Sequence, residues 1–182
     1  MGDVDQVSWE WLYAEHADRV LAYARRRVGP QDAPDVVAET FLAAWRRREA
    51  IPSDPLPWLY AVARNVISNS RRAERRRDAL RDRLAIVRPG GGDDPSRQVA
   101  ERADVLSAIQ QLPPMEREAL MLVTWEDLEP HRAAAALGCS AATLRVRLHR
   151  GRRKLRNLLE GDADSRHPVV PDGLQRAGGA GW

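Results

Sequence analysis

The sequence predicts an all-α protein with two small helical domains joined by a flexible linker, the second domain carrying a helix-turn-helix. Ala, Leu and Arg dominate the composition, and apolar residues recur at helical spacing along most of the 182-residue chain, which favours helices over strands. Two stretches break this pattern: RPGGGDDPS at 88–96 and the Gly- and Pro-rich sequence after residue 160. Neither can continue a helix. The expected organisation is a first domain at 7–83, a linker at 84–98, a second domain at 99–160 and a disordered tail at 161–182.

Three helices are expected in the first domain. The first begins with Ser8 as its N-cap and ends near Val28, where Gly29-Pro30 follows. The second begins at DAPD, 32–35, which supplies a capping side chain, a proline in the first turn and a second acid. The third opens at Pro57, which is the last of the three prolines in the loop IPSDPLP, 51–57. Each helix has one apolar face, so the three are expected to share one core.

The second domain is expected to end in the helix-turn-helix. Its helices are predicted at 99–111, at 114–124 and at 130–137, followed by a long basic helix up to 160. Gly138 supplies a left-handed turn, Ser140 can cap the next helix, and Leu144 and Leu148 belong to a seam that can be buried. The N-terminal half of the basic helix is then free to enter a major groove.

Charge is unevenly distributed, although the net charge is only +3. Nine arginines and three acids in 58–88 give +6, three basic residues and nine acids in 93–129 give −6, and eight basic residues and one acid in 130–160 give +7. A solvated surface helix would normally intersperse acids for pairing at i, i+4, and the basic helix lacks them. The two basic blocks therefore predict two segments that bind nucleic acid, separated by one that does not.

The composition disfavours several classes of protein. The single cysteine, Cys139, rules out an internal disulfide and fits a reducing compartment. No run of 18 apolar residues and no signal peptide occurs, so a cytoplasmic protein is expected. Neither a Gly-rich phosphate loop nor a Ser/His/Asp set is present, so we expect no enzyme and no cofactor. Cys139, His131 and His149 lack the spacing of a metal site, so no metal is expected either.

Two parts of the chain resemble one known family. LPPMEREALMLV and LGCSAATLRVRLHRGRRKL, in the second domain, look like region four of an extracytoplasmic-function (ECF) sigma factor. DAPDVVAETFLAAWRR and PWLYAVARNVISNSRRAERRR, in the first domain, resemble region two of the same family. The resemblance covers Trp9 to Leu159, with the motifs in the family's order.

This resemblance implies an initiation subunit of bacterial transcription. Such a subunit binds the RNA polymerase core, through the clamp of the largest subunit and the flap of the second largest. It reads the minus-ten and minus-thirty-five elements of promoter DNA and helps to melt the former. An anti-sigma factor is a further partner that the sequence leaves open.

The resemblance also assigns residues to each role. Contact with the polymerase core is expected at Asp35, Ala38, Glu39 and Trp45. Recognition and melting of the minus-ten element are expected at Trp58, Arg64, Asn65, Asn69, Arg71, Arg72, Arg75 and Arg76. The minus-thirty-five element is expected to meet Ser140, Ala142, Thr143, Arg145, Val146, Arg147, His149, Arg150 and Arg153.

Purely structural roles stay open for three of these residues. Asp35 can serve only as a favourable acid in the first turn of its helix. Trp45 continues an apolar stripe and can belong to the core, and Trp58 can staple its loop onto the third helix. The alternative function is a helix-turn-helix transcriptional regulator that acts without binding core polymerase, which would leave the first domain unexplained.

Overall fold

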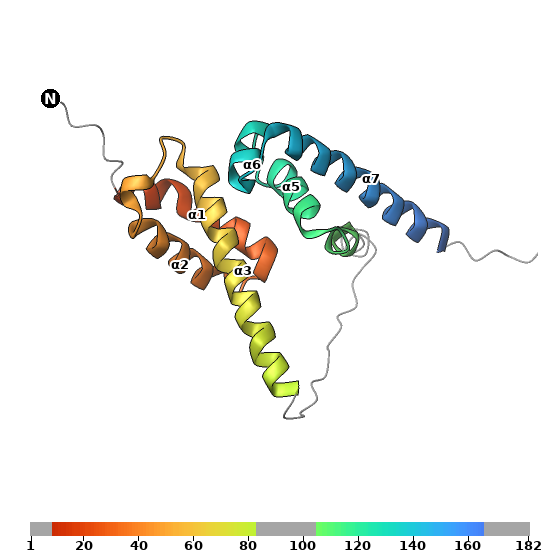
Figure 1. Cartoon of the computed structure of the whole chain (residues 1–182), viewed down its shortest axis with the longest axis horizontal. Coiled ribbons are helices and arrows are strands. Elements are labelled where there is room, and N and C mark those ends of the chain that lie inside the picture. Colours follow the sequence, from red (N-terminus) through yellow and green to blue (C-terminus); the bar gives the residue numbers. More distant parts are fainter. Residues whose placement is uncertain (1–8, 83–104, 166–182) are drawn as a thin grey trace, which may run out of the picture.

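The computed structural model of the chain describes residues 9–82 and 105–165. The regular structure in these ranges is helical throughout, which confirms the all-α prediction (Figure 1). The helices are α1 (Trp9–Val28), α2 (Ala33–Trp45), the short 3-10 helix η1 (Arg48–Ala50), α3 (Pro55–Asp82), α5 (Pro114–Thr124), α6 (Pro130–Leu137) and α7 (Ala141–Ser165). Residues 105–110 are also helical and precede α5. The expected linker at 84–98 lies outside the described residues.

The first helical unit consists of α1, α2 and α3, which pack pairwise around one core. Its centre includes Leu12, Tyr23, Phe41 and Leu59, all of them buried. The rings of Tyr23 and Tyr60 stack with their centroids 4.7 Å apart. Figure 1 shows that α3 continues beyond this bundle, so its later turns project away from α1 and α2.

Two helix starts in this unit differ from the predictions. α3 begins at Pro55 rather than at Pro57, because a proline at the first helical position has the right φ and no N–H to satisfy. Asp32 precedes α2, but its side chain makes no capping hydrogen bond, and its backbone is already helical with φ −89° and ψ −12°. The predicted side-chain cap is therefore wrong, whereas the proline in the first turn is confirmed. α1 ends as predicted, where Gly29 adopts φ +86°.

The second unit consists of α5, α6 and α7, with α6 and α7 forming the predicted helix-turn-helix. Gly138 lies in the turn with φ +60°, and the Ser140 hydroxyl accepts a hydrogen bond from the Thr143 N–H at 3.1 Å. Both features confirm the predicted turn and cap. α7 runs to Ser165, so it includes 161–165, which we expected to belong to the tail.

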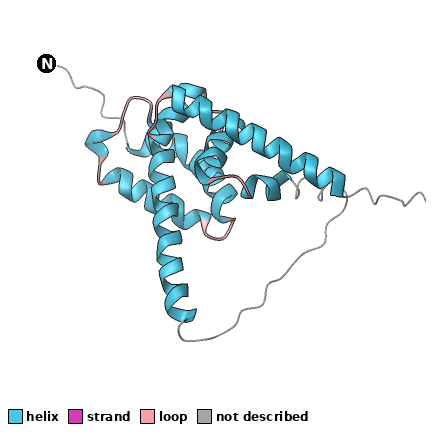
Figure 2. Cartoon of the chain, turned by 45° about the vertical axis from the view of Figure 1, so that its right-hand side comes forward, coloured by secondary structure: helices cyan, strands magenta, loops and turns pink. Residues whose placement is uncertain are grey.

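The two units lie against each other, which the sequence did not predict. α6 packs on α3, and Figure 2 shows the same close approach from a second direction. Arg132 of α6 donates hydrogen bonds to both carboxylate oxygens of Asp54, at 2.8 Å and 2.6 Å. Asp54 directly precedes α3, so this pair fastens one end of the contact.

Candidate nucleic-acid interface

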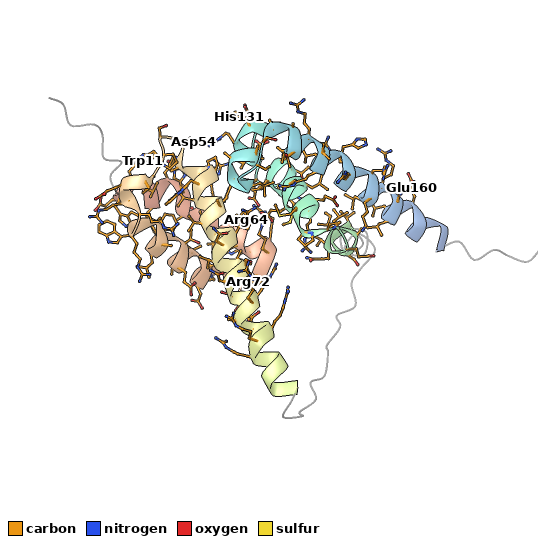
Figure 3. All side chains as sticks on the ribbon, in the orientation of Figure 1. Trp11, Asp54, Arg64, Arg72, His131 and Glu160 are labelled. Carbon is orange, nitrogen blue, oxygen red and sulfur yellow. The ribbon has the colours of Figure 1, made fainter. Side chains whose placement is uncertain are left out.

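α7 presents its predicted DNA-reading residues on one side. Leu144, Leu148 and Gly151 are buried on the other side, where α7 packs against α5 and α6. Eight of the nine predicted residues are exposed, and Arg147 is partly buried at the edge of the face. Figure 3 shows side chains along α7 that project away from the rest of the molecule. The buried seam therefore fixes which side of α7 is open to a partner.

This face of α7 combines the chemical groups that read a duplex. Arg145, Arg150 and Arg153 are exposed, and guanidinium groups can bind guanine edges or phosphates. Val146 is 48% exposed among them, and its methyl groups can contact a thymine methyl. The arrangement suits insertion of α7 into a major groove.

The predicted minus-ten residues do not all lie at one site in the structure. Five of them line a groove of about 440 Å³ between α3 and the second unit, namely Arg64, Asn65, Arg71, Arg72 and Arg75. Asn69 and Arg76 are exposed on α3 but do not line this groove. Trp58 is partly buried against the core, as expected if it fastens its loop to α3. In Figure 3, Arg64 lies on the part of α3 that faces the second unit, and Arg72 lies farther along the helix.

The other wall of the groove comes largely from α5. Met115, Arg117, Glu118 and Met121 border the groove there. Burial lowers the pKa of Arg117, and the charges of Arg71 and Arg27 lower it further. Nη1 of Arg64 is buried without a hydrogen-bond partner. A phosphate or a base acceptor would both offset the excess positive charge and satisfy that donor.

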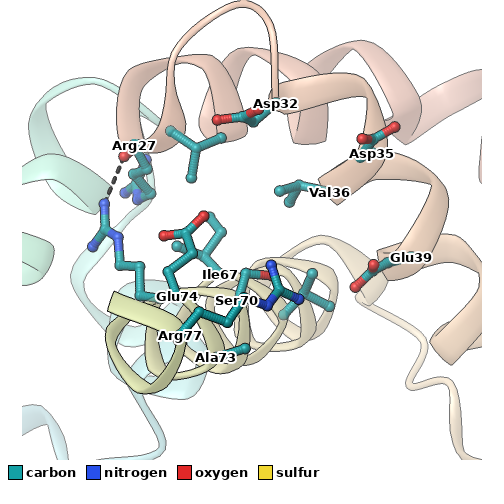
Figure 4. A pocket seen from close by; sticks show the side chains of 13 residues that line it. Arg27, Asp32, Asp35, Val36, Glu39, Ile67, Ser70, Ala73, Glu74 and Arg77 are labelled. Atoms are coloured by element: carbon teal, nitrogen blue, oxygen red, sulfur yellow. Dashed lines mark hydrogen bonds between the residues drawn. The ribbon is translucent and has the colours of Figure 1, made fainter. Parts of the chain in front are cut away.

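Part of the predicted polymerase contact lines a separate pocket of about 590 Å³ between α2 and α3. Its acidic residues are Asp32, Asp35, Glu39 and Glu74, and its basic residues are Arg27, Arg71 and Arg77 (Figure 4). Ala38 is exposed on α2 beside Glu39. Asp35 lies in the first turn of α2, where its charge also favours the helix dipole. Both interpretations of Asp35 therefore fit its position.

Trp45 belongs to an aromatic patch that the sequence analysis missed. It is 45% exposed, so it is not a core residue. The Trp9 ring meets the Trp45 ring edge to face at 5.0 Å and the Phe41 ring at 5.9 Å. Tyr13 and Leu42, close to half exposed, extend the apolar surface. The i, i+4 spacing of Trp9 and Tyr13 could have indicated the patch.

An interdomain cluster of four charged side chains, Arg26, Arg27, Glu118 and Glu126, joins the two units. Arg27 at the end of α1 pairs with Glu118 of α5 at 2.9 Å and with Glu126 at 2.9 Å. Arg26 also pairs with Glu126, and the Tyr23 hydroxyl donates a hydrogen bond to Glu118 at 2.8 Å. The side chains of Arg27, Glu118 and Glu126 are only 6%, 13% and 1% exposed. Two guanidinium groups thus balance two carboxylates largely away from water.

The surroundings of the cluster shift the pKa values of Tyr23 and Arg27. Burial raises the pKa of Tyr23 well above its usual 10.0, and the charge of Glu118 raises it further. Burial opposes the charged form of Arg27, but Tyr23 and the two carboxylates outweigh this and raise the pKa of Arg27. Both groups therefore keep their protons at neutral pH.

Across 9–82 and 105–165, no group of three or more His, Cys, Asp or Glu side chains could hold a metal ion. Cys139 is a free, half-buried cysteine in the turn between α6 and α7. In the same ranges, no helix has the length and apolar character needed to cross a membrane.

Comparisons with known proteins agree with the two-unit architecture. The family Sigma-70 region 2 matches residues 12–77, and Sigma-70, region 4 matches residues 102–155. ECF RNA polymerase sigma factor SigE of Mycolicibacterium smegmatis is 35% identical over 159 residues, which are 84% of this chain and 62% of that protein. The chain thus spans less than two thirds of SigE. RNA polymerase sigma factor CarQ of Myxococcus xanthus is 34% identical over 160 residues, 86% of this chain and 92% of CarQ.

A solved structure extends this similarity to three dimensions. It is the structure of CnrH in complex with the cytosolic domain of CnrY, with a TM-score of 0.60 and 27% sequence identity. The superposition covers 87% of this chain and 92% of CnrH.

Proposed function

This chain belongs to the extracytoplasmic-function sigma factor family, and we propose that it binds the core of RNA polymerase and selects promoters. In this proposal α7 reads the minus-thirty-five element, while α3 reads the minus-ten element and helps to melt it. The two functional domains are 7–83 and 99–160, with 84–98 as the linker and 161–182 as the tail. The exposed face of α7, opposite its buried seam, carries the proposal.

Reading of the minus-thirty-five element rests on the fixed orientation of α7. The Ser140 cap sets where the helix starts, and Leu144 and Leu148 set which face is buried. The proposed readers of the base edges are Arg145, which is exposed on this face, and Arg147, which lies partly buried at its edge. The arginines and the lysine farther along α7 position it on the phosphates, namely Arg150, Arg152, Arg153 and Lys154. A good bidentate contact to a base contributes about 1–3 kcal/mol of discrimination.

Reading of the minus-ten element rests on polar groups that follow one another along α3. Arg64, Asn65 and Asn69 offer hydrogen bonds to unpaired bases. Arg71, Arg72, Arg75 and Arg76 offer charges to the phosphates. The part of Trp58 that the core leaves uncovered can stack on the end of the melted segment, where base stacking on an aromatic ring contributes about 1–3 kcal/mol per base.

The polymerase contact is assigned to α2. The carboxylates of Asp35 and Glu39, with Ala38 beside them, suit a partner surface that presents Lys or Arg, and we assign this partner to the clamp of the largest subunit. The aromatic patch around Trp45 extends the contact with apolar area. The second domain is assigned to the flap of the second largest subunit. An anti-sigma factor is a further proposed partner, because a solved structure of similar fold is that of the sigma factor RpoE in complex with the anti-sigma factor NepR from Bartonella quintana.

Binding to purified core polymerase tests this proposal. The full chain should co-elute with core in size-exclusion chromatography, and Glu39→Arg should weaken this binding because it reverses a charge in the pocket. Asp18→Arg, the same charge reversal at an exposed position of α1 outside the pocket, is the matched control and should bind like wild type. A chain that binds duplex DNA tightly but never co-elutes with core would instead be a helix-turn-helix regulator.

A further inference from the structure

The groove between α3 and α5 is lined by residues of both helical units. Its volume is about 440 Å³, which lies within the range of about 300–1,000 Å³ that is usual for small-ligand sites. Arg64, Asn65 and Arg71 come from α3, whereas Met115 and Arg117 come from α5. The two α5 residues have no part in the proposed promoter contacts. The groove therefore joins two walls of different origin around a space that suits a small molecule.

Positive charge exceeds negative charge in this groove. Among the described residues that line it, Glu118 is the only acid, and it is already paired with Arg27. Five further arginines of the lining form no ion pair with any carboxylate whose side chain the structure describes, namely Arg64, Arg71, Arg72, Arg75 and Arg117. Burial and the nearby charge of Arg71 together lower the pKa of Arg117. An anion with several negative charges would relieve the repulsion between these arginines.

The guanidinium groups have hydrogen-bond donors to spare. Nη1 of Arg64 is buried without a hydrogen-bond partner, which is unfavourable, and a rotation of the guanidinium toward the groove would give this donor a phosphate oxygen. Nη1 of Arg117 donates hydrogen bonds to the carbonyl and to Oε1 of Gln110, at 3.2 Å and 2.8 Å. These bonds hold the Arg117 guanidinium in place and leave Nε and Nη2 to donate elsewhere. Arginine donors of this kind bind phosphate oxygens strongly, because both groups are charged.

The same groove has an apolar side. Met115 is 38% exposed and Met121 is buried, and both line the groove from α5, with Ile67 on the α3 wall. Methionine side chains adapt their shape and pack favourably against aromatic rings. Asn65 and Gln110 are exposed and line the groove as well, and their amides can both donate to and accept from the edge of a base. A flat aromatic base joined to charged phosphates would match both sides of the groove.

We propose that this groove is a binding site for a nucleotide that carries two or more phosphates, with Arg117 and the α3 arginines on the phosphates and Met115 against the base. A single phosphate would leave most of the arginines without a partner, and an inorganic polyphosphate would leave the apolar side empty. The site rests on the charge, donors and apolar surface of the groove, and it does not depend on which promoter elements the chain reads.

Isothermal titration calorimetry of the full chain with ATP, GTP and inorganic triphosphate tests this site. The buffer contains no magnesium, so that the arginines rather than a metal ion meet the phosphates, and its physiological ionic strength screens diffuse attraction. We expect at least one of the two nucleotides to bind once per chain, about tenfold more tightly than inorganic triphosphate. If neither nucleotide binds, or if inorganic triphosphate binds as tightly as the better nucleotide, the proposal is wrong.

Two variants locate the ligand in the groove. Arg117→Gln removes a charge and the guanidinium donors, and it should weaken the nucleotide and inorganic triphosphate alike by about tenfold. Arg25→Gln makes the same change at an exposed position of α1 outside the groove, so this matched control should bind like the parent. Met115→Ala should weaken the nucleotide and leave inorganic triphosphate unchanged, because it removes apolar contact only.

Circular dichroism establishes that each variant keeps its helices. Equal weakening by Arg117→Gln and Arg25→Gln would show that the anions are held only by the general positive charge of the chain, and would overturn the site. Nucleotide affinity that Met115→Ala leaves unchanged would contradict the placement of the base.

Discussion

Gly151 lies where α7 crosses α5, and the change Gly151→Ala probes the contact that orients the recognition face. A Cβ at this position would lie 2.9 Å from Cδ1 and 3.3 Å from Cγ of Leu120, and 3.4 Å from the Glu116 carbonyl oxygen. The first distance is shorter than a methyl contact allows, so either the Leu120 side chain or the helix must move. Leu120 is only 6% exposed, so the space available for this movement is small.

Two opposing contributions set the size of the effect. Alanine improves helix propensity by about 1 kcal/mol relative to glycine. An added methyl group in a packed core typically costs about 1–3 kcal/mol. Because the closest atom is the end of a side chain rather than backbone, we take a cost near the middle of this range. The expected net loss of unfolding free energy is therefore about 1 kcal/mol.

Thermal unfolding followed by circular dichroism measures this loss. Asn157→Ala, at an exposed position of the same helix, serves as the control for a change without a packing cost. In the variant Leu120→Ala/Gly151→Ala the clash is absent, so the second change should cost less in this background than in the parent. An increase in stability of about 1 kcal/mol for Gly151→Ala, additive with Leu120→Ala, would refute the close crossing of α5 and α7.

Three further predictions follow from the described side chains. Arg145→Ala should cost about 1–3 kcal/mol on a matched minus-thirty-five duplex and relax preference at one base. Arg153→Ala should weaken matched and scrambled duplexes alike and reduce the salt slope by about one, and equal losses for both variants on both duplexes would contradict the assignment. Ser140→Ala should lower stability by about 0.5–2 kcal/mol, and Ser140→Thr should restore most of it, because the hydroxyl caps α7. Burial of His16 lowers its pKa below 6.5; the charge of Glu15 opposes this shift to a smaller extent, and the charge of Arg19 adds to it. The unfolded chain therefore takes up the proton first, and stability should fall as the pH drops below 6.5, by at most about 1.4 kcal/mol per pH unit from this group. Denaturant titrations at about pH 7.5 and about pH 5.5 should show a smaller fall for His16→Phe than for wild type.

Local sequence patterns were sufficient to predict the helix-turn-helix. The left-handed turn at Gly138 and the cap at Ser140 each depend on one residue and its immediate neighbours. The buried seam of α7 follows from spacing alone, and it determined the exposed face correctly. At Asp32 the same kind of reasoning failed, because the backbone there is already helical and the side chain cannot reach back to cap α2.

The contacts between the units could not be predicted in this way. Arg26 and Glu126 are separated by 100 positions along the chain, and no periodicity links two residues so far apart. The opposite charges of the first basic block and the acidic block were visible in the sequence, yet they did not show which residues pair. Trp45 illustrates a second limit. By its spacing it belongs to the apolar stripe of α2 that includes Val37 and Phe41, but it lies beyond the end of the core and is 45% exposed.

Run-off transcription with purified core polymerase on genomic fragments tests the central claim most directly. The account predicts that the full chain directs core to initiate at discrete sites, and that Arg145→Ala changes which of these promoters are used while the chain still co-elutes with core. Core that starts transcription at the same sites with and without the chain would contradict the account.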